Sequence, residues 1–234
     1  MKVRRSNERG FADHGWLKSY HSFSFASFYD PNFMGFGPLR VINDDKIAPE
    51  SGFGTHPHQD MEIITYVVEG EVTHKDTLGS HGIIKPGEIQ VMSAGKGIQH
   101  SEHNLHFESL LHLLQIWVMP KTRGLPPRYQ QVSYDTELAQ KMWVKLVSAE
   151  GQGGLVDIDQ DLVLSTTKMK NGDKRSLTTK NSKGRFWLQL VTGEVQIGNY
   201  LLKTGDALYG QNIDLKDQVQ SKVDGTHILW FDMA

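Results

Sequence analysis

Residues 54–72, GTHPHQDMEIITYVVEGEV, combine a closely spaced histidine pair with a hydrophobic run that ends at a Glu-Gly turn. Successive side chains of a β-strand point to opposite faces. His56, His58 and Glu62 would therefore project to the same side of a sheet if this segment formed one strand. Imidazoles and carboxylates are common ligands of transition metals. The segment indicates a β-strand that carries metal donors.

A second polar cluster, HSEHN at residues 100–104, follows a glycine-containing turn. The same alternation places His100 and Glu102 on one face of a second strand. Two such strands that face each other across a small β-barrel would supply their donors to a single metal ion. The candidate ligands are His56, His58, His100 and either Glu102 or Glu62.

The composition is that of a globular protein without a dominant charge. The chain has 234 residues, of which 38% are hydrophobic and 22% charged, enough for one large or two small domains. Its 25 basic and 27 acidic residues give a net charge of −2, so no overall field attracts nucleic acid or an anionic membrane. We therefore expect neither of these among its direct partners.

Cysteine is absent, which excludes disulfides and thiolate metal ligands and fits a reducing compartment. The segment MKVRRSNERG at the start lacks the apolar region of a signal peptide. No apolar stretch reaches the roughly 18 residues that a membrane-spanning helix needs. These features predict a cytoplasmic protein whose metal ligands are imidazoles and carboxylates.

Short apolar runs separated by many of the 23 glycines and 8 prolines predict an all-β fold. Only residues 136–146, TELAQKMWVKL, show a helical period, so we expect few short helices. The composition shifts at residues 120–134, where RGLPPR indicates an extended connection. We place the domain boundary there, with an N-terminal metal-binding domain at 1–133 and a C-terminal domain at 134–234.

The second half of the chain repeats the first in weakened form. Residues 187–195 and 202–208 match residues 64–72 and 84–89 in a strand, a Gly-Glu-Val turn, a second strand and a Lys-x-Gly-acid turn. Such self-similarity predicts the duplication of one β-unit. The second copy has no His-x-His pair, and His227 is the only histidine in the last hundred residues. We therefore expect the second copy to bind no metal.

Several other polar residues are expected outside the metal site. A histidine among aromatic residues is more often packed than a ligand, and a histidine beside a hairpin loop is usually solvated. His14 and His21 lie among aromatic residues, and we expect them to be packed. His74 and His81 flank a hairpin loop, and we expect them to be solvated. His112 and Gln115 have opposite parity on one apolar run, so at most one points into the barrel, and the choice stays open.

Two of these motifs resemble those of the cupin superfamily. The first is His56-Pro57-His58 with Glu62 and Gly70, and the second runs from Gly87 to His100 and Asn104. The duplicated pattern is similar to a bicupin, which implies two antiparallel, jelly-roll-like β-barrel domains. More specifically, the chain resembles the pirin family in three segments, residues 16–45, 52–72 and 92–104.

The pirin resemblance implies a specific ligand set. An ordinary cupin takes its carboxylate ligand from the position of Glu62, whereas pirins use the residue two after the third histidine, here Glu102. The implied ligands are therefore His56, His58, His100 and Glu102, and Glu62 is a nearby carboxylate. The usual metal of the family is iron. Nickel, copper, manganese and zinc also suit imidazole and carboxylate donors.

The resemblance also implies two classes of function. The family includes bacterial members with quercetin 2,3-dioxygenase activity, which implies dioxygen and a flavonol or related enolic small molecule as substrates. Eukaryotic members act as iron-dependent transcriptional co-regulators, which implies a redox or metal sensor with a protein partner. Non-redox cupin chemistry such as isomerisation is a third interpretation.

We expect the enzyme, with Glu102 as its catalytic general base, because a carboxylate within hydrogen-bond reach could accept the acidic hydroxyl proton of a flavonol. The barrel would orient the planar substrate and exclude water. The candidate walls of the cavity are Phe53, Met61 and Trp117.

Overall fold

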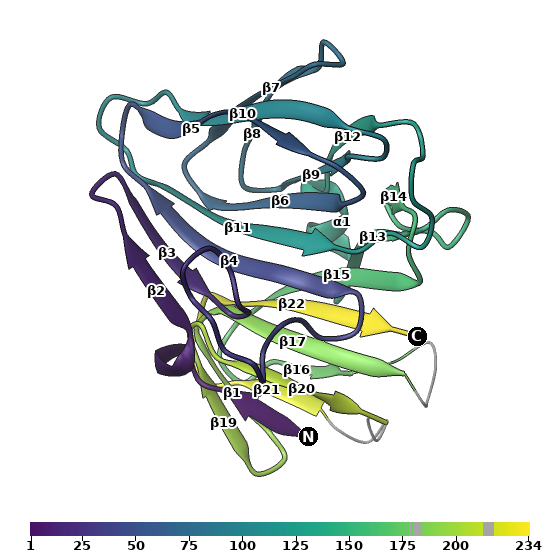
Figure 1. The fold of residues 1–234 in the computed structure, drawn as a ribbon. Helices are drawn as coiled ribbons and strands as arrows, with labels where there is room; N and C mark the ends of the chain where they lie inside the picture. Colours follow the sequence, from purple (N-terminus) through teal and green to yellow (C-terminus); the bar gives the residue numbers. More distant parts are fainter. Residues whose placement is uncertain (178, 180–183, 213–217) are drawn as a thin grey trace. The chain divides into compact units, whose positions relative to one another are not determined.

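The computed structural model of the chain describes residues 1–177, 179, 184–212 and 218–234. It is built almost entirely of antiparallel β-strands, which confirms the expected all-β class (Figure 1). The chain divides into an N-terminal unit of residues 10–135 and 158–160 and a C-terminal unit of residues 1–9, 136–157 and 161–234. None of the helices within the described ranges has the length and apolar character that crossing a membrane requires.

The N-terminal unit contains a seven-stranded and a four-stranded sheet. The larger sheet has the order β12-β9-β6-β11-β4-β3-β2, and the smaller one has the order β5-β10-β7-β8. The strands are β2 (Gly10–Asp13), β3 (Leu17–His21), β4 (Leu39–Ile47), β5 (Ser51–His58), β6 (Glu62–Glu69), β7 (Val72–Asp76), β8 (His81–Ile84), β9 (Glu88–Ser93), β10 (Ile98–Asn104), β11 (Leu111–Val118) and β12 (Arg128–Ser133).

The C-terminal unit has a seven-stranded sheet of order β1-β20-β17-β22-β15-β13-β14 and a four-stranded sheet of order β16-β21-β18-β19. The strands are β1 (Lys2–Arg4), β13 (Val144–Ala149), β14 (Val156–Ile158), β15 (Leu162–Met169), β16 (Lys174–Ser176), β17 (Arg185–Thr192), β18 (Glu194–Ile197), β19 (Tyr200–Lys203), β20 (Ala207–Gln211), β21 (Gln218–Ser221) and β22 (Thr226–Met233).

The helical expectation for residues 136–146 is correct only in its first part. The helix α1 spans Asp135–Gln140, and a 3-10 helix, η1, spans Ser6–Glu8. From Val144 onward the chain forms β13, which pairs with β15 and buries Val144, Leu146 and Val147. Strand pairing and burial of branched side chains therefore override the weak helical period.

The sheet topology confirms the internal repeat. The order β9-β6-β11-β4 recurs as β20-β17-β22-β15 (Figure 1). In the smaller sheets, the order β10-β7-β8 recurs as β21-β18-β19. Gly70 and Gly193 occupy the same turn of each copy, with φ of +77° and +100°. A Cβ atom on Gly70 would lie 2.6 Å from the Leu110 carbonyl oxygen, and one on Gly193 would lie 2.8 Å from Thr226 Cα. The Gly-Glu-Val turn therefore requires glycine in both copies.

An acidic side chain closes the Lys-x-Gly-acid turn in each unit. The backbone N–H of Lys85 donates to Glu88 Oε2 at 2.9 Å, and that of Lys203 donates to Asp206 Oδ2 at 3.1 Å. Gln131, on the edge strand β12, also donates to Glu88, at 3.1 Å. The same carboxylate thus closes the turn and holds the edge of the larger sheet.

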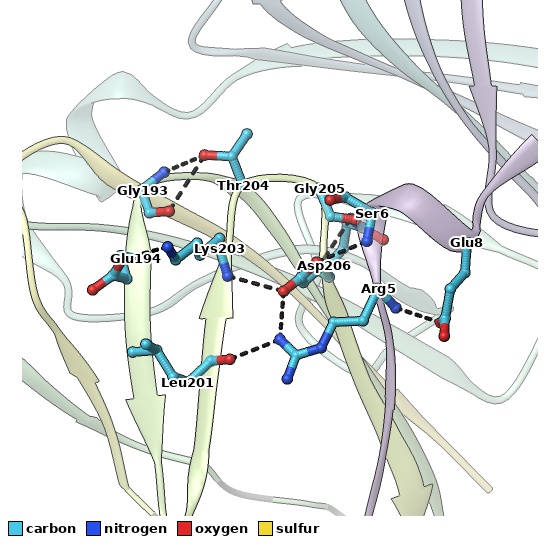
Figure 2. A network of polar contacts seen from close by, with 11 residues as sticks. Arg5, Ser6, Glu8, Gly193, Glu194, Leu201, Lys203, Thr204, Gly205 and Asp206 are labelled. Carbon is cyan, nitrogen blue, oxygen red and sulfur yellow. Dashed lines mark hydrogen bonds and ion pairs between the residues drawn. The ribbon is translucent and has the colours of Figure 1, made fainter. Parts of the chain in front are cut away.

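Asp206 holds the first residues of the chain in the C-terminal unit (Figure 2). The Ser6 backbone N–H donates to Asp206 Oδ1 at 2.7 Å, and Arg5 Nη1 donates to Asp206 Oδ2 at 2.8 Å. The Arg5 guanidinium also donates to the Leu201 carbonyl at 2.8 Å. These bonds fix the segment after β1, which pairs with β20 at the edge of the sheet.

We predict that Asp206→Ala lowers the free energy of unfolding of the C-terminal unit by about 1–3 kcal/mol, because it leaves the Ser6 and Lys203 N–H groups without their acceptor. Urea denaturation measures the change. Glu194→Ala is the matched control, since Glu194 meets only the exposed Lys203 ammonium at 3.9 Å in the same network, and it should cost less than about 1 kcal/mol. Equal stabilities of the two variants would contradict the role of Asp206.

Candidate metal centre

Three histidines converge where β5 pairs with β10. His56 and His58 lie on β5, and His100 on β10 stands directly opposite His56 in the antiparallel register. Their ring centroids are 4.4 Å apart for His56 and His100 and 4.9 Å apart for the other two pairs. One ring nitrogen of each lies within 4.8 Å of the others. The two strands are hydrogen-bonded neighbours, so the expectation that they face each other across a barrel is wrong.

The lowered pKa values of two of these imidazoles and their free ring nitrogens suit the binding of a cation. Burial and the neighbouring His56, His58 and His74 lower the pKa of His100 to about 2, and burial with His56 lowers that of His58 to about 4. His56 Nδ1 donates to the Gly54 carbonyl at 2.8 Å, so Nε2 is the nitrogen that this bond leaves for a metal. His100 Nε2 is buried and has no hydrogen-bond partner. Neutral imidazoles with a free buried nitrogen fit a divalent transition metal.

Glu102 lies two residues beyond His100 and is buried. Thr65 Oγ1 donates to Glu102 Oε1 at 3.0 Å, and Gln115 Nε2 donates to Oε2 at 2.7 Å. Burial raises the pKa of this carboxyl to about 7 in spite of both hydrogen bonds. Its oxygen lies within 4.8 Å of donor nitrogens of His100 and His74, and it lines the same cavity as His56 and His58. The structure thus brings all four predicted donors to one region. They fall into two groups, one of His56, His58 and His100 and one of His74, His100 and Glu102.

Glu62 points elsewhere, so the single-strand interpretation of residues 54–72 is wrong. The chain turns between β5 and β6, with Asp60 at φ +49°, and the alternation of faces does not continue through the turn. The Glu62 carboxylate accepts hydrogen bonds from Ser93 Oγ at 2.5 Å and from the Asp159 backbone N–H at 3.3 Å. Burial raises its pKa against these two bonds.

His74 is buried rather than solvated, contrary to expectation. Its Nδ1 lies 3.5 Å from His100 Nδ1, and its Nε2 lies 3.1 Å from Asp76 Oδ2. The other oxygen of Asp76 accepts the backbone N–H groups of Leu78 and Ser80, both at 2.9 Å. His74 is thus a partner for Nδ1 of His100, and such a partner on the nitrogen that does not bind the metal fixes the orientation of a metal-binding imidazole. His74 shares the parity of the buried Val72, a signal present in the sequence.

A cavity of about 490 Å³ opens beside these donors. Its walls include Phe53 and Trp117, as expected, whereas Met61 packs against a separate apolar cluster around Ile63 and Met92. Of the two residues of opposite parity on β11, Gln115 lines the cavity, whereas His112 does not and its Nε2 lies 2.7 Å from Asp44 Oδ1. The lining residues are Ala12, His14, Leu17, Ser19, His21, Phe25, Ala26, Ser27, Asn43, Asp45, Phe53, His56, His58, Glu102, Gln115 and Trp117.

His14 and His21 therefore border the site from which sequence reasoning excluded them. His21 is packed and hydrogen-bonded as expected, through Nδ1 to Asn43 Oδ1 at 2.8 Å, yet it also lines the cavity. Its place on β3, two strands from β11, could not be found without the order of the sheet.

The C-terminal unit replaces this polar interior with an apolar one. The repeat and the strand registers align Thr65, His74, Glu102 and Gln115 with Leu188, Ile197, Val219 and Trp230. All four of these replacements belong to one buried hydrophobic cluster. Within the described part of this unit, no group of histidines and carboxylates with metal-ligand spacing occurs.

Comparison with known proteins agrees with this architecture. The chain matches the Pirin family model at residues 2–118 and the model of the quercetinase C-terminal cupin domain at residues 145–233. It is 47% identical over 206 residues to a quercetin 2,3-dioxygenase of Escherichia coli K12, covering 88% of this chain and 87% of that protein.

Two solved structures have nearly the same fold. One is YhhW from Escherichia coli, with a TM-score of 0.93 and 42% identity over 100% of this chain and 97% of that chain. The other is the bacterial pirin YhhW of Escherichia coli in complex with nickel(II), with a TM-score of 0.91 and 42% identity over 99% and 98%.

We predict one equivalent of a divalent transition metal per chain, bound by the N-terminal unit. His56→Ala or His100→Ala should weaken binding by more than about 100-fold, because a lost ligand costs more than a lost supporting residue. Metal analysis after dialysis and calorimetric titration measure the effect. His112→Ala serves as the control because His112 bonds Asp44 outside the cavity. Full metal occupancy in His100→Ala would contradict the assignment.

A second pair of variants separates the two carboxylates. Glu102→Gln should weaken metal binding strongly if Glu102 is a ligand, whereas Glu62→Gln should cost about 10- to 100-fold at most. Both are charge-neutralising changes of the same residue type, so each controls for the other. The reverse order of metal affinities would show that the ordinary cupin ligand position is used instead.

Proposed function

The chain belongs to the pirin family, and we propose that it is a metal-dependent dioxygenase that cleaves a flavonol or related enolic substrate as quercetin 2,3-dioxygenase does. The observation that carries this proposal is that three of the four donors, His56, His58 and Glu102, lie on the wall of a cavity that also has aromatic, small and polar side chains. An accessible donor set leaves room for a substrate beside a bound ion, unlike a closed structural site.

The proposed ligands are His56, His58, His100 and Glu102, and the proposed metal is iron, with nickel, copper, manganese and zinc as alternatives. The buried, unpartnered Nε2 of His100 supports a cation at this place. Any of these ions would supply Lewis-acid stabilisation of a substrate oxyanion, and all except zinc could also supply redox access to dioxygen.

Glu102 is the proposed general base. A flavonol carries an acidic hydroxyl beside a carbonyl, and its proton would pass to a carboxylate oxygen of Glu102 at the cavity wall. Thr65 and Gln115 hold that carboxylate through one hydrogen bond to each oxygen. Each oxygen keeps a further lone pair, so one oxygen could bind the metal while the other accepts the proton.

Aromatic side chains would orient the planar substrate and exclude water. Trp117 packs edge-on against His58 and Phe25, with ring centroids 4.9 and 5.5 Å apart. Its Nε1 is buried without a hydrogen-bond partner, so it can donate to a substrate oxygen beside the histidines. Phe53 closes the cavity near His56, with ring centroids 6.3 Å apart.

We predict that the iron-loaded protein cleaves quercetin, consumes dioxygen and releases carbon monoxide. Glu102→Gln should reduce the rate per bound metal by about 10²- to 10⁴-fold, the usual contribution of a general base. An oxygen electrode and carbon monoxide detection measure the reaction, with anaerobic samples and free metal as controls.

The alternative is an iron-dependent redox or metal sensor that acts through a protein partner. It replaces the dioxygenase if the iron-, nickel-, copper- and manganese-loaded proteins all bind quercetin yet release no carbon monoxide above the free-metal control.

A further inference from the structure

Strands β3 and β4 carry a buried polar wall that the proposed chemistry does not use. His21 on β3, Asn43 on β4 and Gln115 on β11 stand side by side in the strand register. His21 bonds both Asn43 and Ser19, with Nδ1 2.8 Å from Asn43 Oδ1 and 3.3 Å from Ser19 Oγ. These side chains are buried and line the cavity, so the larger sheet presents polar groups to it.

Asp45 is the exceptional member of this wall. It stands opposite Ser19 in the register and is only 3% exposed. The Ser19 hydroxyl bonds its carboxyl, yet Asp45 Oδ1 has no hydrogen-bond partner. No ion pair of the described residues involves Asp45. A buried carboxyl oxygen without a partner is unfavourable unless a ligand satisfies it.

The surroundings of Asp45 favour a hydrogen-bonding ligand over a cation. Burial, with smaller contributions from Asp44 and Glu102, raises the pKa of Asp45 to about 7 against the Ser19 hydrogen bond. A carboxyl of this kind is readily protonated and can accept or donate a single hydrogen bond near neutral pH. Leu17, Phe25 and Phe53 line the cavity around this wall and suit an apolar ring.

We propose that Asp45 binds a phenolic hydroxyl of the substrate through Oδ1, at the β3–β4 wall, while the chelating oxygens of the same molecule lie at the histidines. This inference rests on the proposed function and specifies its substrate class. The site selects flavonols that carry a hydroxyl group on a ring away from the chelating pair. Asp45 is then a specificity-determining residue supplied by the larger sheet, whereas the metal donors come from the smaller one.

The test compares two ligands on the metal-loaded protein without oxygen. Quercetin and 3-hydroxyflavone share the chelating hydroxyl and carbonyl, but only quercetin has further hydroxyls. Asp45→Leu should weaken quercetin binding by about 10- to 100-fold, the usual cost of leaving a buried polar group without its hydrogen-bond partner, and leave 3-hydroxyflavone binding and metal content unchanged. Asp45→Asn keeps an acceptor oxygen, so it should lower the preference for quercetin over 3-hydroxyflavone less than Asp45→Leu does.

Glu69→Leu is the control, since Glu69 is an exposed carboxylate on β6 of the same sheet and does not line the cavity. Equal weakening of both ligands by Asp45→Leu, loss of metal, or an unchanged preference in both Asp45 variants would overturn the inference. Failure of the wild-type protein to bind quercetin would overturn it as well. Selective binding without carbon monoxide release would overturn only the proposed dioxygenase reaction.

Discussion

The antiparallel pairing of β5 with β10 is the constraint on which the metal centre depends. It sets His100 opposite His56, and a slip of one residue would turn the imidazoles to opposite faces. The register then shifts between His100 and Glu102, so that Glu102 stands opposite Phe53. This irregularity lets one strand present a histidine to β5 and a carboxylate to Thr65 and Gln115 of the larger sheet.

Support for the histidines comes from a third strand. β7 pairs with the other side of β10 and places His74 beside His100 and Glu102. Asp76 at the end of β7 bonds His74 and also receives two backbone N–H groups of the following hairpin turn. The orientation of His100 therefore depends on His74, the orientation of His74 depends on Asp76, and Asp76 is held by the exposed hairpin turn.

The two units share a sheet order but differ in whether the side chains between the sheets are apolar or polar. In the C-terminal unit, Leu188, Ile197, Val219 and Trp230 join one continuous apolar cluster. In the N-terminal unit, polar side chains occupy the equivalent places, and apolar clusters around Leu113 and Ile63 lie apart from one another. Buried polar groups are costly unless hydrogen bonds or a ligand satisfy them, whereas packed apolar groups need no such partner. The same sheet order therefore serves as a packed core in one unit and as a cavity in the other.

Local patterns in the sequence determined the all-β class, the repeated unit with its required glycines, and the placement of His56 and His58 on one face of a strand, because strand alternation and turn chemistry act over a few neighbouring residues. The pairing of β10 with β5, which sets His100 opposite His56, joins segments far apart in the chain. Only the tertiary structure decided which carboxylates face the cavity. The turn at Asp60 moved Glu62 away, and strand order brought Asp45 and His21 to the cavity and β1 to the edge of the C-terminal sheet. Such placements depend on pairing between segments far apart in the chain, which no local periodicity encodes.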